Sequence, residues 1–377
     1  MKVLTVCVPG ATTRTTSCWC VRIVTSRFTP RRGATPARRC KRTRRELDGD
    51  SWKRMTRTIT KMNIEILKER QQWTLPQKID HSLGVIDQFN SHFNGQVFVS
   101  FSGGKDSVAM LSLVEMIIPK VKCMFVMTGC ESPSVCRFVR QMKSDGHNID
   151  IVKPDKTLRQ VFAEYGFPLV SKEVSHYVKQ VRRNPDCATA KMIMENKTRH
   201  GIPARWLYLI DEPYEVSDRC CFWLKKQPAY NYTKRTGLRP FIGLTAVESH
   251  LRTKSYLLRG GCNSFFEDSK HHAASWPLAI WTEQDVWQYI RERGLKIPDI
   301  YQHGATRTGC MGCGFGAHMH GESLEVMQRL WPRWYDMVMD YENSGHRYGD
   351  ALAKAIEIGK HFKKNNGNNK DIQAAET

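Results

Sequence analysis

No stretch of the 377 residues approaches the ~20 consecutive apolar residues that a membrane-spanning helix needs. Residues 1–45 contain no Asp or Glu, and no apolar run there is long enough for the core of a secretory signal. Because that signal is lacking, the 13 cysteines are expected to be buried fillers, metal ligands or reactive thiols rather than disulfides. We therefore predict a cytoplasmic protein with no membrane partner.

The formal net charge of +21 is distributed unevenly. Residues 1–62 carry 16 Lys and Arg against 3 Asp and Glu, whereas the other 315 residues carry 42 against 34. Residues 1–45 resemble a mitochondrial transit peptide in composition. The favoured alternative is a natural start at Met62, so residues 1–61 are predicted to be a basic, disordered leader. The rest is moderately basic, which suits phosphate-bearing ligands and permits nucleic acid without requiring it.

Strand and helix patterns alternate along the remaining chain. Residues 96–101 are apolar, β-branched and aromatic, which predicts a buried strand. Further strands are predicted at 122–127, 149–152 and 240–246, and helices within 62–93 and at 108–118, 134–144, 157–165, 248–258, 282–293, 322–342 and 347–362. This order predicts a mostly parallel, Rossmann-like α/β sheet with helices on both faces. Residues 363–377 are predicted to be a disordered tail.

A glycine-rich turn joins the first strand to its helix. It consists of Ser102, Gly103, Gly104, Lys105, Asp106 and Ser107. Two glycines let a ligand approach the backbone, and the N–H groups at a helix start face an anion. The spacing differs from that of the common nucleoside-triphosphatase loop. The turn therefore predicts a phosphate site, with Lys105 and Asp106 as candidate catalytic residues; the alternative is an ordinary Gly-Gly turn.

Four cysteines form two pairs that are separated by 88 residues. The pairs are Cys220-Cys221 and Cys310-x-x-Cys313. A Cys-x-x-Cys turn directs two thiolates toward one centre. Four thiolates could hold zinc or an iron–sulfur cluster, and adjacent cysteines fit the spread iron corners of a cubane more easily than one small ion. Two unrelated buried pairs are the alternative.

These motifs together resemble the phosphoadenosine phosphosulfate (PAPS) reductase family, within the PP-loop adenine-nucleotide α-hydrolase superfamily. The turn looks like the superfamily's pyrophosphate loop, and the cysteine spacing looks like the 4Fe–4S branch of the sulfonucleotide reductases. Similar segments are Thr128-Gly129-x-Glu131-x-Pro133, with Met127 where the family usually has Asp, Gly243-x-x-x-x-Glu248-Ser249-x-x-Arg252, and Pro277-Leu-x-x-Trp281-Thr-x-x-Asp285-Val-Trp287. The resemblance spans about residues 62–345.

The resemblance implies a nucleotide domain at 62–300 and a cluster-binding helical region at 301–362. The implied ligands are ATP, PAPS or adenylyl sulfate, Mg²⁺, and a 4Fe–4S cluster on the four cysteines. Glu131 and Arg252 join Lys105 and Asp106 as implied catalytic residues. The other implied nucleotide-binding residues are Ser102, Gly103, Gly104, Ser107, Thr128, Gly129, Gly243, Glu248 and Ser249.

One departure concerns the reaction. Sulfonucleotide reductases attack the sulfate sulfur with a cysteine near the C-terminus, but no cysteine follows Cys313. Cys262 is a candidate replacement, although a buried structural thiol is the favoured interpretation.

Three functions follow. The first is an ATP pyrophosphatase-type sulfur transferase with a sulfur donor and a tRNA or DNA acceptor. The second is a sulfonucleotide reductase served by a thioredoxin-like partner, and the third is a non-catalytic cluster-bearing module. Basic residues that could contact acceptor phosphates, or form only a solvated helix face, are Lys179, Arg182, Arg183, Lys191, Lys197 and Arg199.

Overall fold

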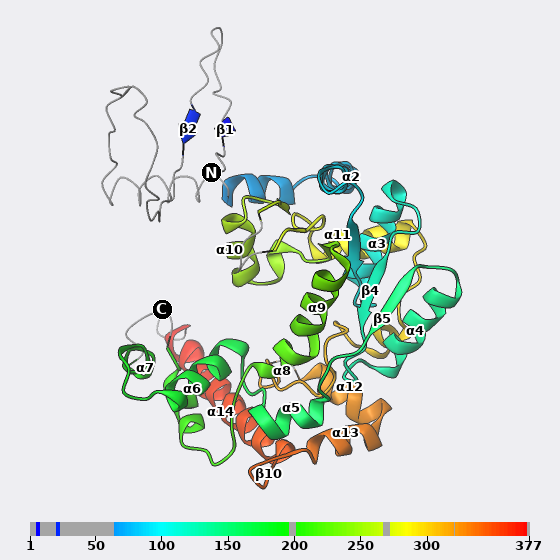
Figure 1. Ribbon diagram of the computed structural model, residues 1–377. Helices are drawn as coiled ribbons and strands as arrows, with labels where there is room; N and C mark the ends of the chain where they lie inside the picture. Colours follow the sequence, from blue (N-terminus) through cyan, green and yellow to red (C-terminus); the bar gives the residue numbers. More distant parts are fainter. Residues whose placement is uncertain are drawn as a thin grey trace, which may run out of the picture. The chain divides into compact units, whose positions relative to one another are not determined.

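The computed structural model describes residues 5–7, 20–22, 64–195, 201–266, 272–319 and 321–374 (Figure 1). The chain divides into two compact units, Met1–Lys53 and Arg54–Thr377. In the first unit, strands β1 (Thr5–Cys7) and β2 (Cys20–Arg22) pair antiparallel. The rest of the predicted leader lies outside the described residues.

A six-stranded sheet lies at the centre of the second unit, in the order β5-β4-β3-β6-β8-β7. All neighbouring strands are parallel except β7 and β8, which confirms the predicted mostly parallel α/β architecture. The strands are β3 (Val97–Ser100), β4 (Cys123–Val126), β5 (Ile149–Val152), β6 (Arg239–Ile242), β7 (Asn263–Ser264) and β8 (Ala274–Ser275).

Helices surround the sheet and extend beyond it (Figure 1). Residues 64–71 are helical. The helices that follow are α2 (Leu75–His92), α3 (Lys105–Ile117), α4 (Pro133–Ser144), α5 (Leu158–Tyr165), α6 (Lys172–Arg183), α7 (Ala188–Met194), α8 (Arg219–Cys221), α9 (Gln227–Thr236), α10 (His250–Leu258), α11 (Glu283–Glu292), α12 (Glu322–Leu330), α13 (Pro332–Met339) and α14 (Tyr348–Ala374). Helix α8 continues into a π-helical turn, Phe222–Lys226, and β9 (Glu342–Asn343) pairs with β10 (His346–Arg347).

Side-chain alternation gives the sheet two buried faces. Val99 and Phe125 belong to the main hydrophobic core, together with side chains from α2, α3, α4 and α11. Phe98 and Met124 point to the opposite face, where Tyr232 of α9 closes a smaller core. Successive residues of a strand face opposite sides, so the apolar runs of β3 and β4 satisfy both layers at once.

Three elements differ from the predicted ones. The predicted strand 240–246 ends at Ile242, where the chain passes the start of α3: a Cβ on Gly243 would lie 3.1 Å from the backbone oxygen of Asp106. The predicted helix 322–342 is two helices, because Pro332 cannot donate the backbone hydrogen bond that would continue α12. Helix α14 continues to Ala374, past the end predicted at 362. None of the described helices is both long and apolar enough to span a bilayer.

Candidate functional site

The predicted phosphate turn lies at the carboxyl end of β3 and leads into α3. Gly103 has a φ of +72°, and a Cβ there would lie 2.9 Å from side-chain atoms of Val135 and Val139. Gly104 is the N-cap of α3, and a Cβ there would overlap the hydroxyl of Thr308. Both positions therefore require glycine: Gly103 for its positive φ and the lack of space, and Gly104 for the close approach of the segment that carries Thr308.

Two serine hydroxyls fix the shape of the turn. The Ser107 hydroxyl donates to the backbone oxygen of Gly104 at 2.8 Å and accepts from the Ser102 N–H at 3.2 Å. The Ser102 and Ser107 hydroxyls lie 3.1 Å apart. The predicted phosphate turn, Ser102 to Ser107, is thus held in a fixed shape between strand β3 and helix α3 by its own hydrogen bonds.

Lys105 is a buried cation at this turn, with only 6 % of its surface exposed. Its Nζ lies 3.2 Å from Glu283 and 3.5 Å from Asp106, and 5.8 Å from the centre of the Trp287 ring. Its backbone N–H donates to the Tyr301 hydroxyl at 2.9 Å. The sequence did not identify Glu283, Trp287 or Tyr301 as partners, because each comes from a distant segment.

The second loop, which follows β4, is held in shape by the carboxylate of Glu131. Glu131 accepts from the Thr128 N–H at 2.9 Å and from the Thr128 hydroxyl at 2.6 Å. The Cys130 N–H donates to the same hydroxyl at 3.0 Å, and Gly129 adopts a φ of +79°. Ser132 then caps α4: its hydroxyl accepts from the Val135 N–H at 3.3 Å. The Glu131 carboxylate is therefore engaged in holding the loop.

The third loop carries an ion pair toward the phosphate turn. Glu248 pairs with Arg252, and its other oxygen lies 3.9 Å from Arg307. Ser249 caps α10 by accepting from the Arg252 N–H at 3.3 Å. Burial, followed by the charge of Arg307, lowers the pKa of the Arg252 guanidinium, and nearby Asp106 opposes that shift. The predicted residues of the first and third loops thus converge at one edge of the sheet.

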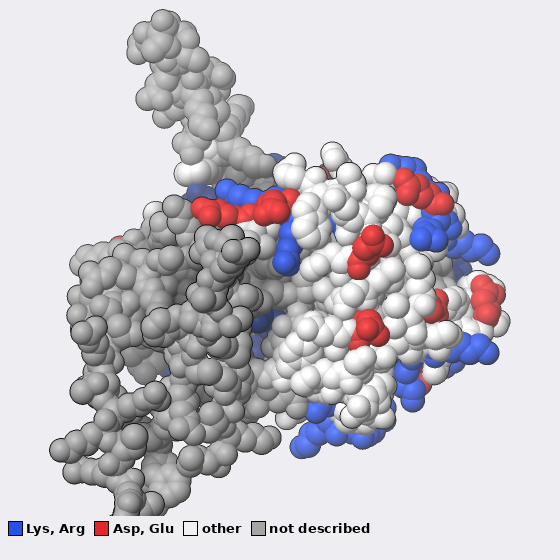
Figure 2. Space-filling model, turned by 90° about the horizontal axis from the view of Figure 1, so that it is seen from above, with Lys and Arg blue, Asp and Glu red and all other residues white. Residues whose placement is uncertain are grey.

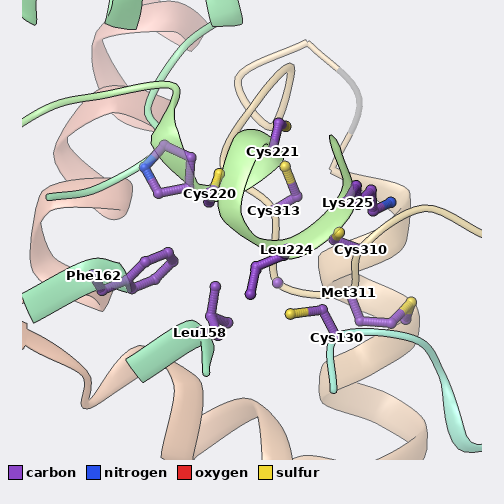
Figure 3. Close-up of a pocket in the computed structure, with 12 residues that line it drawn as sticks. Cys130, Leu158, Phe162, Cys220, Cys221, Leu224, Lys225, Cys310, Met311 and Cys313 are labelled. Atoms are coloured by element: carbon purple, nitrogen blue, oxygen red, sulfur yellow. The ribbon is translucent and has the colours of Figure 1, made fainter. Parts of the chain in front are cut away.

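A pocket lined by five cysteines adjoins this edge (Figure 3). Four of them are the two predicted pairs, Cys220 and Cys221 from α8 and Cys310 and Cys313 from the segment after Tyr301. The fifth is Cys130, which belongs to no cysteine motif that the sequence reveals. Its position directly after the second strand, at the ligand-binding edge of a parallel sheet, was the available signal.

Residues 167–170 form backbone hydrogen bonds with segments next to both cysteine pairs. The Phe167 N–H donates to Glu215 O at 2.8 Å, and the Ser217 N–H donates to Phe167 O at 3.0 Å, just before the first pair. The Gly316 N–H donates to Val170 O at 2.8 Å, just after the second pair. Segments that are far apart in the sequence therefore share one short backbone scaffold.

The Cys-x-x-Cys turn depends on glycine and on a buried tyrosine. Gly312 has a φ of +73°, and its carbonyl accepts from the Tyr348 hydroxyl at 2.9 Å. A Cβ on Gly314 would lie 2.8 Å from that hydroxyl and would overlap the Pro168 carbonyl. The remaining pocket wall is mainly apolar, from Leu158, Phe162 and Leu224.

The pocket thiols differ in acidity. A hydrogen bond with Cys220 lowers the pKa of Cys221, with the charges of Lys172 and Lys225 acting in the same direction. Burial, followed by the neighbouring Cys310, raises the pKa of Cys313 to about 12. The charge of Cys310 in turn raises the pKa of Lys225. The basic side chains thus stabilise thiolates on one side of the pocket.

The donor set is that of a soft metal site. Among the residues that the structure describes, however, no three Cys, His, Asp or Glu side chains are arranged to hold one metal ion. The structure therefore places the four predicted ligands in one pocket without assigning a metal to them.

Cys262 does not line this pocket. Its side chain is buried beside His81, with Sγ 3.7 Å from Nε2, and burial raises its pKa to about 11. A protonated, buried thiol is a poor nucleophile, which agrees with the structural role favoured from the sequence.

Two of the six basic residues proposed to contact an acceptor have internal roles. Lys179 pairs with Asp218 at 2.5 Å. The Arg182 guanidinium donates to four backbone carbonyls, those of Leu209, Ile210, Glu212 and Tyr214. Arg183 and Lys191 are exposed, whereas Lys197 and Arg199 lie outside the described residues. On the face in Figure 2, the visible acidic and basic side chains are interspersed.

The fold and site define a Rossmann-like α/β protein whose glycine-rich turn lies at the same sheet edge as a pocket of thiols. The phosphoadenosine phosphosulfate reductase domain matches residues 96–314, and the chain belongs to that family. This membership confirms the resemblance drawn from the motifs, while the 4Fe–4S branch stays a prediction.

Three similar proteins span different shares of the chain. An uncharacterised protein of Methanocaldococcus jannaschii is 23 % identical over 279 residues, 73 % of this chain but only 48 % of that protein. Adenosine 5'-phosphosulfate reductase 1 of Bacillus subtilis is 22 % identical over 235 residues, 62 % of this chain and 79 % of the enzyme. The crystal structure of a phosphoadenylyl-sulfate reductase from Candida auris, in a phosphate complex, aligns with 70 % of this chain and 96 % of its own at 13 % identity and a TM-score of 0.37.

Proposed function

We propose that this chain is an ATP pyrophosphatase-type sulfur transferase that acts on an acceptor such as nucleic acid, with a 4Fe–4S cluster in the cysteine pocket. The observation that carries the proposal is the segment from Tyr301 to Cys313. Tyr301 contacts the phosphate turn through the Lys105 N–H, and Met311 N–H donates to Cys130 O at 2.7 Å at the cysteine pocket. One short segment therefore joins the nucleotide edge to the thiols.

The nucleotide would lie across the carboxyl edge of the sheet. The start of α3 and Lys105 would hold its phosphates, because a helix N-terminus and a buried ammonium both favour anions. Arg252 of α10 and Arg307 of the segment from Tyr301 to Cys313 would add positive charge, and Mg²⁺ would offset the remaining phosphate charge. An acceptor oxygen would attack the α-phosphorus as pyrophosphate leaves, and a donor's sulfur nucleophile would then displace AMP.

Cys220, Cys221, Cys310 and Cys313 would hold the cluster. Thiolates are the usual ligands of such clusters, and Lys172 and Lys225 would offset their negative charge. A bound cluster would supply a site for binding or delivering sulfur. The protein's own contribution would be to keep these thiols together beside the nucleotide, in a pocket with apolar walls.

Reduction of a sulfonucleotide is the second candidate. The name of the Bacillus subtilis relative favours it, since that protein is an adenosine 5'-phosphosulfate reductase. Against it stand the burial of Cys262 and the absence of cysteine from residues 314–377. A partner thiol would then have to supply the electrons.

Product analysis of the full chain, purified without oxygen, separates the two reactions. With ATP, we expect pyrophosphate to form at a rate that tRNA or DNA increases, and AMP to be released when a sulfide donor is also present. With PAPS or adenylyl sulfate and a thioredoxin-like reductant, we expect no sulfite. Sulfite release without ATP turnover would replace the proposal with the reductase assignment. If neither product forms although the protein binds nucleotide and carries its full metal content, the protein would be a non-catalytic binding module.

A further inference from the structure

The fifth thiol of the pocket is not needed by the proposed set of four ligands. Cys130 belongs to the second loop, next to Glu131, and 1 % of its surface is exposed. It lines the same pocket as Cys310 (Figure 3). Hydrogen bonding between the two thiols raises the pKa of Cys130 and lowers the pKa of Cys310.

The backbone fixes this pair of thiols at close range. Met311 N–H donates to Cys130 O at 2.7 Å, so Cys310 is the immediate neighbour of a residue that is hydrogen-bonded to Cys130. A disulfide needs about 4.4–6.8 Å between its Cα atoms. The backbone hydrogen bond beside Cys310 keeps the two cysteines near that range.

The other thiol pairs in the pocket are less favourable. Cys220 and Cys221 are adjacent within the helical turn of α8, where a disulfide would close a small ring and distort the helix. Cys313 accepts a hydrogen bond from the backbone of Phe315. Cys310 thus has in Cys130 a partner from a different segment, and a backbone hydrogen bond joins that segment to its own.

We infer that Cys130 and Cys310 form a redox-active pair, which closes to a disulfide when the pocket holds no metal. The two thiols lose two protons and two electrons as the S–S bond forms, and a small oxidant such as diamide takes both up and becomes a hydrazine. The bond would tie the second loop covalently to the cysteine segment. If the proposed function is right, the bond would also remove one of the four cluster ligands.

The test is disulfide mapping on the full chain after metal removal with a chelator. The folded protein is treated with excess diamide, quenched in acid, alkylated, digested and analysed by mass spectrometry. We expect the Cys130 peptide to be joined to the Cys310 peptide and to separate after reduction. A bond from Cys310 to Cys313, or alkylation of Cys130 as a free thiol, would overturn the inference.

Two variants provide the controls. Cys130→Ser should lose the mapped bond, whereas Cys136→Ser, a half-buried cysteine of α4 outside the pocket lining, should keep it. Because the mapping uses metal-free protein, it is independent of the cluster. A protein without iron would end the cluster proposal and leave the disulfide result standing, and a failed mapping would leave the cluster proposal untouched.

Discussion

Lys105 concentrates the charge of the candidate nucleotide site in one buried side chain. Two carboxylates, those of Asp106 and Glu283, balance it, and the Trp287 ring covers one side. A buried ammonium costs free energy unless such partners are present. An arriving phosphate would meet a cation that is already oriented, so binding would need little rearrangement.

Replacing this lysine should weaken nucleotide binding. Lys105→Ala removes a charge-assisted contact of about 1.5–3 kcal/mol, so we expect the Kd for ATP to rise by about ten- to a hundredfold. Titration calorimetry with the full chain measures the change. Lys68→Ala, at an exposed position in the helix of residues 64–71, is the matched control and should bind as the parent does. An unchanged Kd for Lys105→Ala would place the phosphates elsewhere.

At the scale of elements, one carboxylate of helix α11 both caps its own helix and forms an ion pair with a second helix. Asp285 accepts from the Thr282 N–H at 2.6 Å, which completes a capping box at this helix start. The same oxygen accepts from Lys78 Nζ of α2 at 2.6 Å, and only 2 % of that lysine side chain is exposed. Two helices that flank the main core are therefore joined through one residue.

Asp285→Ala should be strongly destabilising. It removes a cap and leaves the Lys78 ammonium buried without its partner, so we expect a loss of about 3 kcal/mol in the free energy of unfolding. Chemical denaturation followed by circular dichroism gives the value. Gln160→Ala breaks the exposed capping box of α5, which holds no buried lysine, and should cost about 0.5 kcal/mol. Equal losses in both variants would mean that the contact with Lys78 contributes nothing.

The elements with a strong local signal agree with the sequence prediction, and the others do not. β3, β4 and β5 are apolar runs with helices between them, so their position and parallel order follow from the chain itself. β7 and β8 have two residues each and exist only through their pairing, which no periodicity reveals. Helix α12 ends before Pro332, although the apolar spacing continues past it, because backbone hydrogen bonding overrides side-chain pattern.

At the scale of the whole molecule, the site is a product of long-range pairing. The sequence identifies four cysteines and the phosphate turn, since each carries a local motif. It does not reveal Cys130 as a fifth thiol, Tyr301 as a partner of the Lys105 N–H, or Arg307 as a neighbour of Glu248. Those contacts depend on how the segment from Tyr301 to Cys313 crosses the sheet edge, and that path is fixed by tertiary packing alone.

The cysteine pocket joins elements from distant parts of the second unit, so a bound metal should stabilise the unit as a whole. Ligands that bind only the folded state raise its stability, and a metal on thiolates contributes several kcal/mol. We expect anaerobic reconstitution with iron and sulfide to raise the Tm by roughly 5–10 °C over chelated protein. Cys310→Ser should lose both this rise and the brown colour, whereas Cys136→Ser should keep both. Scanning calorimetry, with iron, sulfide and zinc assays on the same samples, decides which metal binds. An equal rise in Tm with zinc in colourless protein would assign a zinc site. No rise in Tm with either metal would mean that the pocket binds neither.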